Sequence, residues 1–189
     1  MTEVSLIAPF SMTKNPIVQH MQVPNEEKET EVCQIMLAGG CFWGIEAGFY
    51  RIPGILTTVV GYTGGIEEDP DYTQVSTGKT GHVEAVCIAY DPAVITLPAI
   101  LSRFFSLFDS TAEEVTVGFD GSQYRSAIFC CTKEDCLTVQ AFIQEIEASG
   151  EYDNHILTAV LPAGTFWPAE DYYQQYYEKI RARYQKPLF

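Results

Sequence analysis

The sequence predicts an α+β fold, a two-layer sandwich in which helices flank a mixed β-sheet. Apolar runs typical of strands are interleaved with segments of helical periodicity from Val32 onward. The strand at His82 to Asp91 follows its predecessor through a loop rather than a helix, which favours a mixed over an all-parallel sheet. The 189 residues show no linker and no shift in composition, so we expect one domain.

The first 30 residues differ from the rest, because they mix proline, threonine and asparagine with the charged run NEEKETE and show no period. We expect residues 1–30 to form an extended or partly ordered arm, and residues 31–189 to form the single domain. The arm lacks a basic region followed by a continuous apolar run, so we expect no secretion signal and a cytoplasmic location. No apolar run approaches the roughly 20 residues that cross a bilayer.

Short apolar or β-branched runs bounded by turn residues predict strands at residues 32–38, 55–65, 82–91, 124–131 and 154–163. Helical spacing predicts helices at residues 42–52, 97–109, 133–149 and 169–184. Gly39-Gly40 stops the first strand and Pro53-Gly54 ends the first helix, so Cys41 lies where strand and helix meet. Residues 66–81 and 113–123 are rich in turn residues or lack a period, and predict loops.

Charge and cysteine usage exclude several functions. The formal net charge of −14 repels phosphate, so neither nucleic acid nor an anionic membrane is an expected partner. Six cysteines without a signal peptide are expected to be thiols rather than a disulfide framework. The cluster of Cys130, Cys131 and Cys136 has neither the spacing of a zinc site nor a nearby histidine, so we expect no metal there.

Cys41 is the first candidate for chemistry. At a helix start, unpaired N–H groups and the helix dipole favour the thiolate, which is the nucleophilic form of cysteine. Gly39 and Gly40 permit a backbone geometry and a close approach that a Cβ would obstruct. The alternative is that Cys41 is a buried, unreactive small hydrophobe, because cysteine is among the most buried residue types. The local residues leave both interpretations open.

The rings of Phe42 and Trp43 follow Cys41 directly. Two consecutive aromatics cannot both face the core from a helix start, so one ring is left beside the sulfur and forms an apolar pocket for a methyl group. The alternative is that both rings are core residues, which is the usual fate of aromatics.

Glu84 stands in an otherwise apolar strand. If Glu84 is buried, its pKa is raised towards the protonated form that can donate a proton; if the strand lies at an edge, the carboxylate faces water. His82 lies on the same predicted face, where it could bind a metal together with Glu84 and Cys41 or make a structural hydrogen bond.

Six motifs occur in order between Val32 and about Lys179: GGCFWGIEAGF, VVGYTGG, DYTQVSTGKTGHVEAV, YDP, GSQYRSAIF and PAEDYYQQYY. Together they resemble the A-type peptide methionine sulfoxide reductases. The resemblance implies a ferredoxin-like core, no bound metal or cofactor, and thiol-dependent reduction of free or peptide-bound methionine S-sulfoxide. It also implies a sulfenic acid intermediate on the attacking cysteine, and it favours a structural role for His82.

The resemblance implies a role for each matching residue. Cys41 would attack the sulfoxide sulfur, and Glu84 would supply the proton that the sulfoxide oxygen needs as charge builds on it. Tyr72 and Tyr124 match the phenols that bind this oxygen. The rings after Cys41, Phe42 and Trp43, would hold the ε-methyl group.

The sequence departs from the family pattern near its predicted site. An aspartate commonly stands five residues before the tyrosine of QYRS, but this chain has Phe119 there, and Asp120 is the candidate to replace it through a loop shift. In the final helix Tyr173 stands at a common histidine position.

Recycling of Cys41 is the second open point. Many family members resolve the sulfenic acid with another cysteine, often in a C-terminal tail, but this chain has no cysteine after Cys136. We therefore expect an external thiol, either a thioredoxin-like protein or a small thiol, to reduce Cys41. The alternative is a resolving role for Cys130, Cys131 or Cys136, although adjacent cysteines in an apolar run also suit core packing.

Two other functions fit parts of the sequence. A peroxide-reactive thiol protein would use Cys41 but would leave Trp43, Glu84 and the two tyrosines without a task. A non-catalytic or weakly catalytic binder of oxidised methionine would keep the aromatic pocket. Our expectation is a monomeric enzyme acting on oxidised proteins or free methionine sulfoxide, with thioredoxin as a candidate partner.

Overall fold

The computed structural model describes residues 31–111 and 122–184. The strands in these ranges are β1 Cys33–Ala38, β2 Ile55–Thr63, β3 Val83–Tyr90, β4 Ala127–Cys130, β5 Ala159–Pro162 and β6 Phe166–Pro168. The helices are α1 Phe42–Phe49, α2 Tyr72–Val75, α3 Leu97–Phe105, α4 Lys133–Ala148 and α5 Tyr176–Tyr184, and Ser122–Tyr124 form a 3₁₀ turn.

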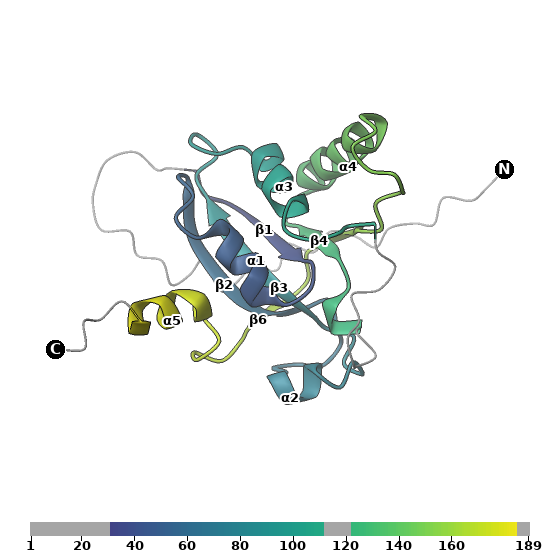
Figure 1. The fold of residues 1–189 in the computed structure, drawn as a ribbon. Coiled ribbons are helices and arrows are strands. Elements are labelled where there is room, and N and C mark those ends of the chain that lie inside the picture. The colour runs from purple at the N-terminus through teal and green to yellow at the C-terminus, as the bar shows by residue number, and fades with distance from the viewer. Residues whose placement is uncertain (1–30, 112–121, 185–189) are drawn as a thin grey trace.

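The strands form one mixed sheet in the order β5-β4-β1-β3-β2-β6 (Figure 1). Only the β4–β5 pair is parallel among the described strands; the other neighbours pair antiparallel. The central four strands, with α1 after β1 and α3 after β3, have the βαββαβ arrangement of ferredoxin-like folds. The predicted α+β fold with a mixed sheet is therefore confirmed.

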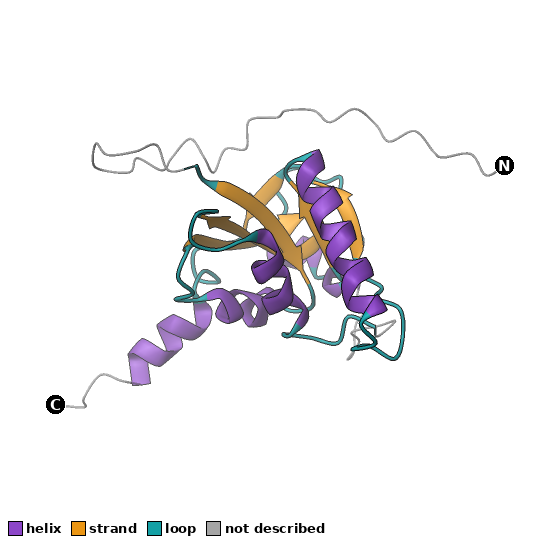
Figure 2. Ribbon diagram, turned by 90° about the horizontal axis from the view of Figure 1, so that it is seen from above, coloured by secondary structure: helices purple, strands orange, loops and turns teal. Residues whose placement is uncertain are grey.

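Helices α1, α3 and α4 cover one face of the sheet (Figure 2). Side chains of β1, β2 and β3 that point to this face, such as Ile35, Tyr62 and Ile88, join the helices in the main core. Alternate residues of β1 and β3, such as Cys87, form a smaller cluster on the opposite face together with Phe129 of β4. This two-residue alternation was predicted for β3 and is confirmed, and it assigns Glu84 to the helix-covered face.

β3 lies between β1 and β2, and all eight of its residues are buried. The alternative of Glu84 facing water from an edge strand is therefore excluded, since Glu84 is 2% exposed. A carboxyl group in the middle of a sheet loses most of its hydration, and this loss governs its chemistry.

The structure differs from the prediction in two short elements and in several boundaries. For example, β5 begins at Ala159 rather than at residue 154, and α3 ends at Phe105 rather than at residue 109. The predicted loop after β2 contains α2, and β6 has no counterpart in the prediction. Both are shorter than the windows in which hydrophobic periodicity can be detected. The last helix begins at Tyr176 rather than at residue 169, because Gln175 has a positive φ of 51° and interrupts the helical backbone. In the described ranges, no helix is both long and apolar enough to cross a membrane.

Candidate active site

Cys41 is exposed and lies at the N-cap of α1, directly after the turn that ends β1. The turn needs both glycines: Gly40 has a φ of 89°, and a Cβ on Gly39 would lie 2.7 Å from the ring of Phe108. The Gly40 N–H also donates to the Tyr124 carbonyl over 3.1 Å. These contacts fix the cysteine where strand and helix meet, as the sequence predicts.

The thiol of Cys41 is subject to opposing electrostatic effects. Burial of the sulfur and the charge of Glu84 raise its pKa, whereas the backbone N–H groups of Trp43 and Gly44 lower it. The predicted helix-start effect is thus present, but the net shift of the pKa is upward. Burial is the larger of the two causes that raise the pKa, and repulsion by the Glu84 charge adds to it, so together they outweigh the helix start.

The Glu84 carboxyl group is hydrogen-bonded to the start of α1. Its Oε2 atom accepts a hydrogen bond from the Phe42 N–H over 3.0 Å, and it also accepts one from the Cys41 thiol. Burial raises the pKa of Glu84 to about 7, although both of these hydrogen bonds lower it. At neutral pH the carboxyl group is therefore divided between its protonated and ionised forms, which suits a group that transfers a proton.

Two phenols lie beside this pair. Tyr72 is the first residue of α2 and Tyr124 the last of the 3₁₀ turn, and the two hydroxyls are hydrogen-bonded to each other. Burial and the charge of Glu84 raise the pKa of both tyrosines, that of Tyr124 to about 12. Both phenols are therefore protonated at neutral pH and can donate hydrogen bonds to an oxygen placed between them.

Aromatic rings extend the site away from the sulfur. Phe42 is 1% exposed and belongs to the core, whereas Trp43 is only partly buried. The Trp43 ring stacks on Tyr176 with centroids 3.9 Å apart and lies 5.6 Å from Tyr173. Tyr173 in turn lies 5.0 Å from Tyr72. The Phe42 ring therefore points into the core. The Trp43 ring instead forms an aromatic wall together with Tyr72, Tyr173 and Tyr176.

Comparison with known proteins identifies this arrangement. A family model described as "Peptide methionine sulfoxide reductase" matches residues 33–188. The chain belongs to the peptide methionine sulfoxide reductase family. It is an oxidoreductase that reduces methionine sulfoxide to methionine by a thiol-dependent mechanism.

The curated relatives include the peptide methionine sulfoxide reductase MsrA of Methanoculleus marisnigri. That protein is 45% identical over 140 residues, which are 74% of this chain and 85% of the relative. Among solved structures, the reduced form of Mxr1 from Saccharomyces cerevisiae superposes with a TM-score of 0.73 at 30% identity, covering 86% of this chain and 91% of Mxr1. Mxr1 in complex with Trx2 also matches, with a TM-score of 0.55 at 24% identity over 81% of this chain and 90% of that one.

In this reductase, His82 has no free ring nitrogen. Its Nδ1 accepts from the Gly65 N–H over 3.1 Å, and its Nε2 lies 2.8 Å from the Glu67 carbonyl, to which it donates. His82 thus holds the loop that follows β2. No group of three or more metal-ligating side chains occurs in the described ranges.

The cysteines other than Cys41 lie away from it. Cys130 is paired with Ile35 of β1, and Ile35 is paired with Ile88 of β3. Ile88 lies four residues along β3 from Glu84, the residue that contacts Cys41. This separation is about 13 Å along the strand, and a disulfide needs Cα atoms within about 7 Å. Cys131 follows Cys130 in the sequence, and Cys136 is hydrogen-bonded to Cys130. The structure therefore brings none of these three candidates to Cys41.

The structure describes one of the two departures from the family pattern, Tyr173, but not the other, Phe119. Phe119 and Asp120, including the predicted substrate contact of Asp120, lie outside the described residues. Tyr173, at the common histidine position, contributes its ring to the aromatic wall.

Sequence reasoning missed the residues that hold this wall. Residues 169–178 lie beside β2, and Gln174 links this segment to the strand. Its side chain accepts from the Val60 N–H over 2.9 Å and donates to the Val60 carbonyl over 2.8 Å. Glu46 of α1 accepts from the Gln175 N–H over 2.9 Å. These residues lie within the motifs PAEDYYQQYY and GGCFWGIEAGF, but no period or spacing distinguishes them from surface residues.

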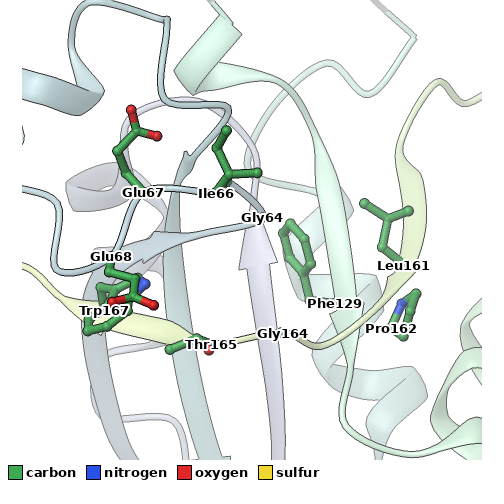
Figure 3. A pocket seen from close by; sticks show the side chains of 11 residues that line it. Gly64, Ile66, Glu67, Glu68, Phe129, Leu161, Pro162, Gly164, Thr165 and Trp167 are labelled. Carbon is green, nitrogen blue, oxygen red and sulfur yellow. The ribbon is translucent and has the colours of Figure 1, made fainter. Parts of the chain in front are cut away.

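A hollow of about 710 Å³ lies on the face of the sheet opposite the helices α1, α3 and α4 (Figure 3). Its lining combines the loop at Gly64–Glu68 with Phe129, Leu161 and Trp167. Phe129 belongs to the smaller cluster, on the face away from Glu84 and Cys41. This hollow is separate from the reductase site.

Proposed function

We propose that Cys41 is the attacking thiol, that Glu84 is the proton donor, and that the substrate is the S-sulfoxide of free or peptide-bound methionine. The observation that carries this proposal is the hydrogen bond between the Cys41 thiol and a Glu84 carboxyl group whose pKa is about 7. A nucleophile and an acid thus share one proton beside two protonated phenols.

The first step transfers two electrons from one sulfur to the other. The proton of the Cys41–Glu84 pair ends on Glu84, and the Cys41 thiolate attacks the sulfoxide sulfur. Glu84 then protonates the sulfoxide oxygen, while Tyr72 and Tyr124 donate hydrogen bonds to it as negative charge builds. The hydroxyl formed in this way then passes to the Cys41 sulfur, as the bonds that join the methionine sulfur to this oxygen and to Cys41 break. Methionine leaves with the electron pair, and Cys41 becomes a sulfenic acid.

The aromatic wall supplies the specificity for a methyl thioether in this proposal. Trp43 presents a partly exposed ring next to Cys41, and Phe42 supports it from the core. An apolar surface of this size binds a methyl group by excluding water but offers nothing to a charged or strongly polar group. Asp120 stays a candidate for substrate contact.

An external thiol completes turnover in this proposal. The thiol attacks the sulfenic acid and releases water, which leaves a mixed disulfide with Cys41, and a second thiol then restores Cys41. The description of Mxr1 in complex with Trx2 supports a thioredoxin as this reductant. We propose the cytoplasm as the compartment, because the cycle consumes reduced thiols, and a monomer as the active form.

The decisive experiment is an assay on resolved S and R sulfoxides of a blocked methionine, with dithiothreitol as reductant and methionine formation as readout. We expect the S form alone to be reduced, and Cys41→Ser to abolish the reaction while it preserves the fold. Cys131→Ser is the matched control, because it makes the same change away from the site. Reduction of the R form, or an active Cys41→Ser variant, would overturn the proposal.

A further inference from the structure

Glu170 makes two hydrogen bonds, one with each of its carboxylate oxygens. Oε2 accepts from the Tyr62 hydroxyl over 3.1 Å, and Oε1 accepts from the Tyr72 N–H over 3.2 Å. None of the ion pairs in the described ranges involves Glu170. The carboxylate therefore connects the sheet to the start of α2, and a basic partner does not explain its presence.

The two partners of Glu170 differ in how firmly the fold holds them. Tyr62 is fully buried in β2, in the position paired with Glu84. Tyr72 begins a helix of only four residues, which cannot be stable alone. Glu170 thus transmits the rigid position of the sheet to a short helix that carries one of the site's phenols.

The first four N–H groups of α2, from Asp71 to Gln74, have no partner within the helix. The Asp71–Gln74 capping box uses two of them, the Gln74 N–H and the Asp71 N–H. The Tyr72 N–H is another, and Glu170 accepts it. Without Glu170 this donor has no protein partner, and the backbone at Tyr72 is free to rotate away from the site.

We propose that Glu170 is a positioning residue for the sulfoxide step, which it promotes by holding Tyr72 where its hydroxyl meets the sulfoxide oxygen. Glu170 touches neither the substrate nor Cys41. The inference rests on the role proposed above for Tyr72. It extends that role to a residue more than 90 positions away in the chain, on the segment that also carries Tyr173.

The test measures the single-turnover rate of methionine formation at saturating sulfoxide. Glu170→Ala removes both acceptors, and we expect the rate to fall about tenfold, the value of one hydrogen bond to a charged group. Glu170→Gln retains an oxygen for the Tyr72 N–H and can donate to the Tyr62 oxygen, so we expect it to restore most of the rate. Asp171→Asn removes the same charge at the neighbouring exposed position and should leave the rate unchanged.

A double-mutant cycle distinguishes positioning from general support of the fold. In a Tyr72→Phe background there is no hydroxyl to position, so Glu170→Ala should cost less than about twofold further. Tyr62→Phe offers an independent variant that keeps the buried ring. It removes one anchor of Glu170, and we expect a fall of about threefold that also disappears in the Tyr72→Phe background.

Three results would count against the inference. An unchanged rate in Glu170→Ala, or equal losses with and without the Tyr72 hydroxyl, would overturn it and leave the role of Tyr72 intact. A Tyr72→Phe enzyme as fast as the unmodified chain would overturn the role of Tyr72 itself, and the positioning role with it.

Discussion

At the scale of single residues, the first N–H groups of α1 bind two acidic side chains, Cys41 and Glu84. These N–H groups hydrogen-bond both the Cys41 sulfur and the Glu84 carboxylate. Burial raises the pKa of both groups, and the charge of Glu84 raises that of Cys41 further, so the pair keeps at least one proton at neutral pH. The state required for attack, with a thiolate and a protonated acid, is therefore one proton shift away from the resting state.

Glu84→Gln tests the acid directly. Glutamine keeps the shape of the side chain and removes the transferable proton, so we expect the rate of the sulfoxide step to fall by about 10². Rapid quenching and quantification of methionine in a single turnover would measure it. An unchanged rate would place the acid elsewhere.

The pH dependence follows from the same pair. The reaction needs one proton on the two groups together, which holds above the pKa of Glu84, about 7, and below that of Cys41, which lies above its ordinary value of 9.0. Below pH 7 the pair gains a second proton and the thiolate is lost; above the Cys41 pKa the acid is lost.

We therefore expect the single-turnover rate to be highest between these limits and to fall by about tenfold per pH unit on the acid side. In Glu84→Gln the decline near pH 7 should disappear, and the slower rate should follow ionisation of Cys41 alone. A profile that keeps its ionisation near pH 7 in Glu84→Gln would contradict the assignment.

The sequence suggested the residues to which we assign the chemistry, but it did not show their environment. The motifs led to Cys41, Glu84, Tyr72 and Tyr124, and the structure places these four side chains within electrostatic reach of one another. The net direction of the Cys41 pKa could not be predicted. It depends first on how deeply the fold buries the sulfur and then on the approach of Glu84, 43 residues later in the sequence, and local patterns encode neither.

At the scale of secondary structure, the segment before α5 depends on polar side chains rather than on hydrophobic burial. Glu46 is 3% exposed and accepts from the Thr58 hydroxyl over 3.1 Å as well as from the Gln175 N–H. It joins α1, β2 and the start of α5. Tyr176, which follows Gln175 directly, covers the ring of Trp43.

We expect Glu46→Ala to lower the free energy of unfolding by about 2–3 kcal/mol, because it leaves two donors without a partner in a buried place. Arg51→Ala removes the exposed ion pair with Glu178, which joins the turn after α1 to α5, and should cost at most about 1 kcal/mol. Urea denaturation would measure both. Equal losses would show that the segment is held by charge at its surface.

The long elements could be predicted from sequence, and so could the four-residue strands β4 and β5, but β6 and α2 could not. β1, β3 and α4 are continuous apolar or amphipathic runs with clear ends, and their predicted and observed bounds agree within one or two residues. β6 has three residues and α2 has four. Their formation depends on pairing with β2 and on the Asp71–Gln74 capping box, which are tertiary or side-chain effects.

At the scale of the whole molecule, the thiols are distributed over the two ends of the strands. Cys41 and Glu84 lie at one end, and Cys33, Cys130 and Cys136 gather near the other. Burial raises the pKa of Cys130, and the same cause raises the pKa of Cys131 to about 11. Buried thiols of high pKa react slowly, so Cys130 and Cys131 are suited to packing.

One equivalent of sulfoxide, added without any thiol, should therefore leave one sulfenic acid on Cys41 and no intramolecular disulfide. Trapping with a sulfenic-specific reagent followed by peptide mass spectrometry would locate the modification. Cys130→Ser and Cys136→Ser should not change the yield. A disulfide between Cys41 and any of the other five cysteines would contradict the expectation and would require a rearranged chain.

The stack of Trp43 on Tyr176 has a practical consequence. The chain contains only two tryptophans, Trp43 and Trp167, and Trp167 lies in β6. A Trp167→Phe protein would keep a single indole, which adjoins Cys41 in the sequence and faces the site's aromatic wall. Because indole fluorescence depends on what contacts the ring, the emission of that protein would report substrate binding and Cys41 oxidation in real time, without an added label.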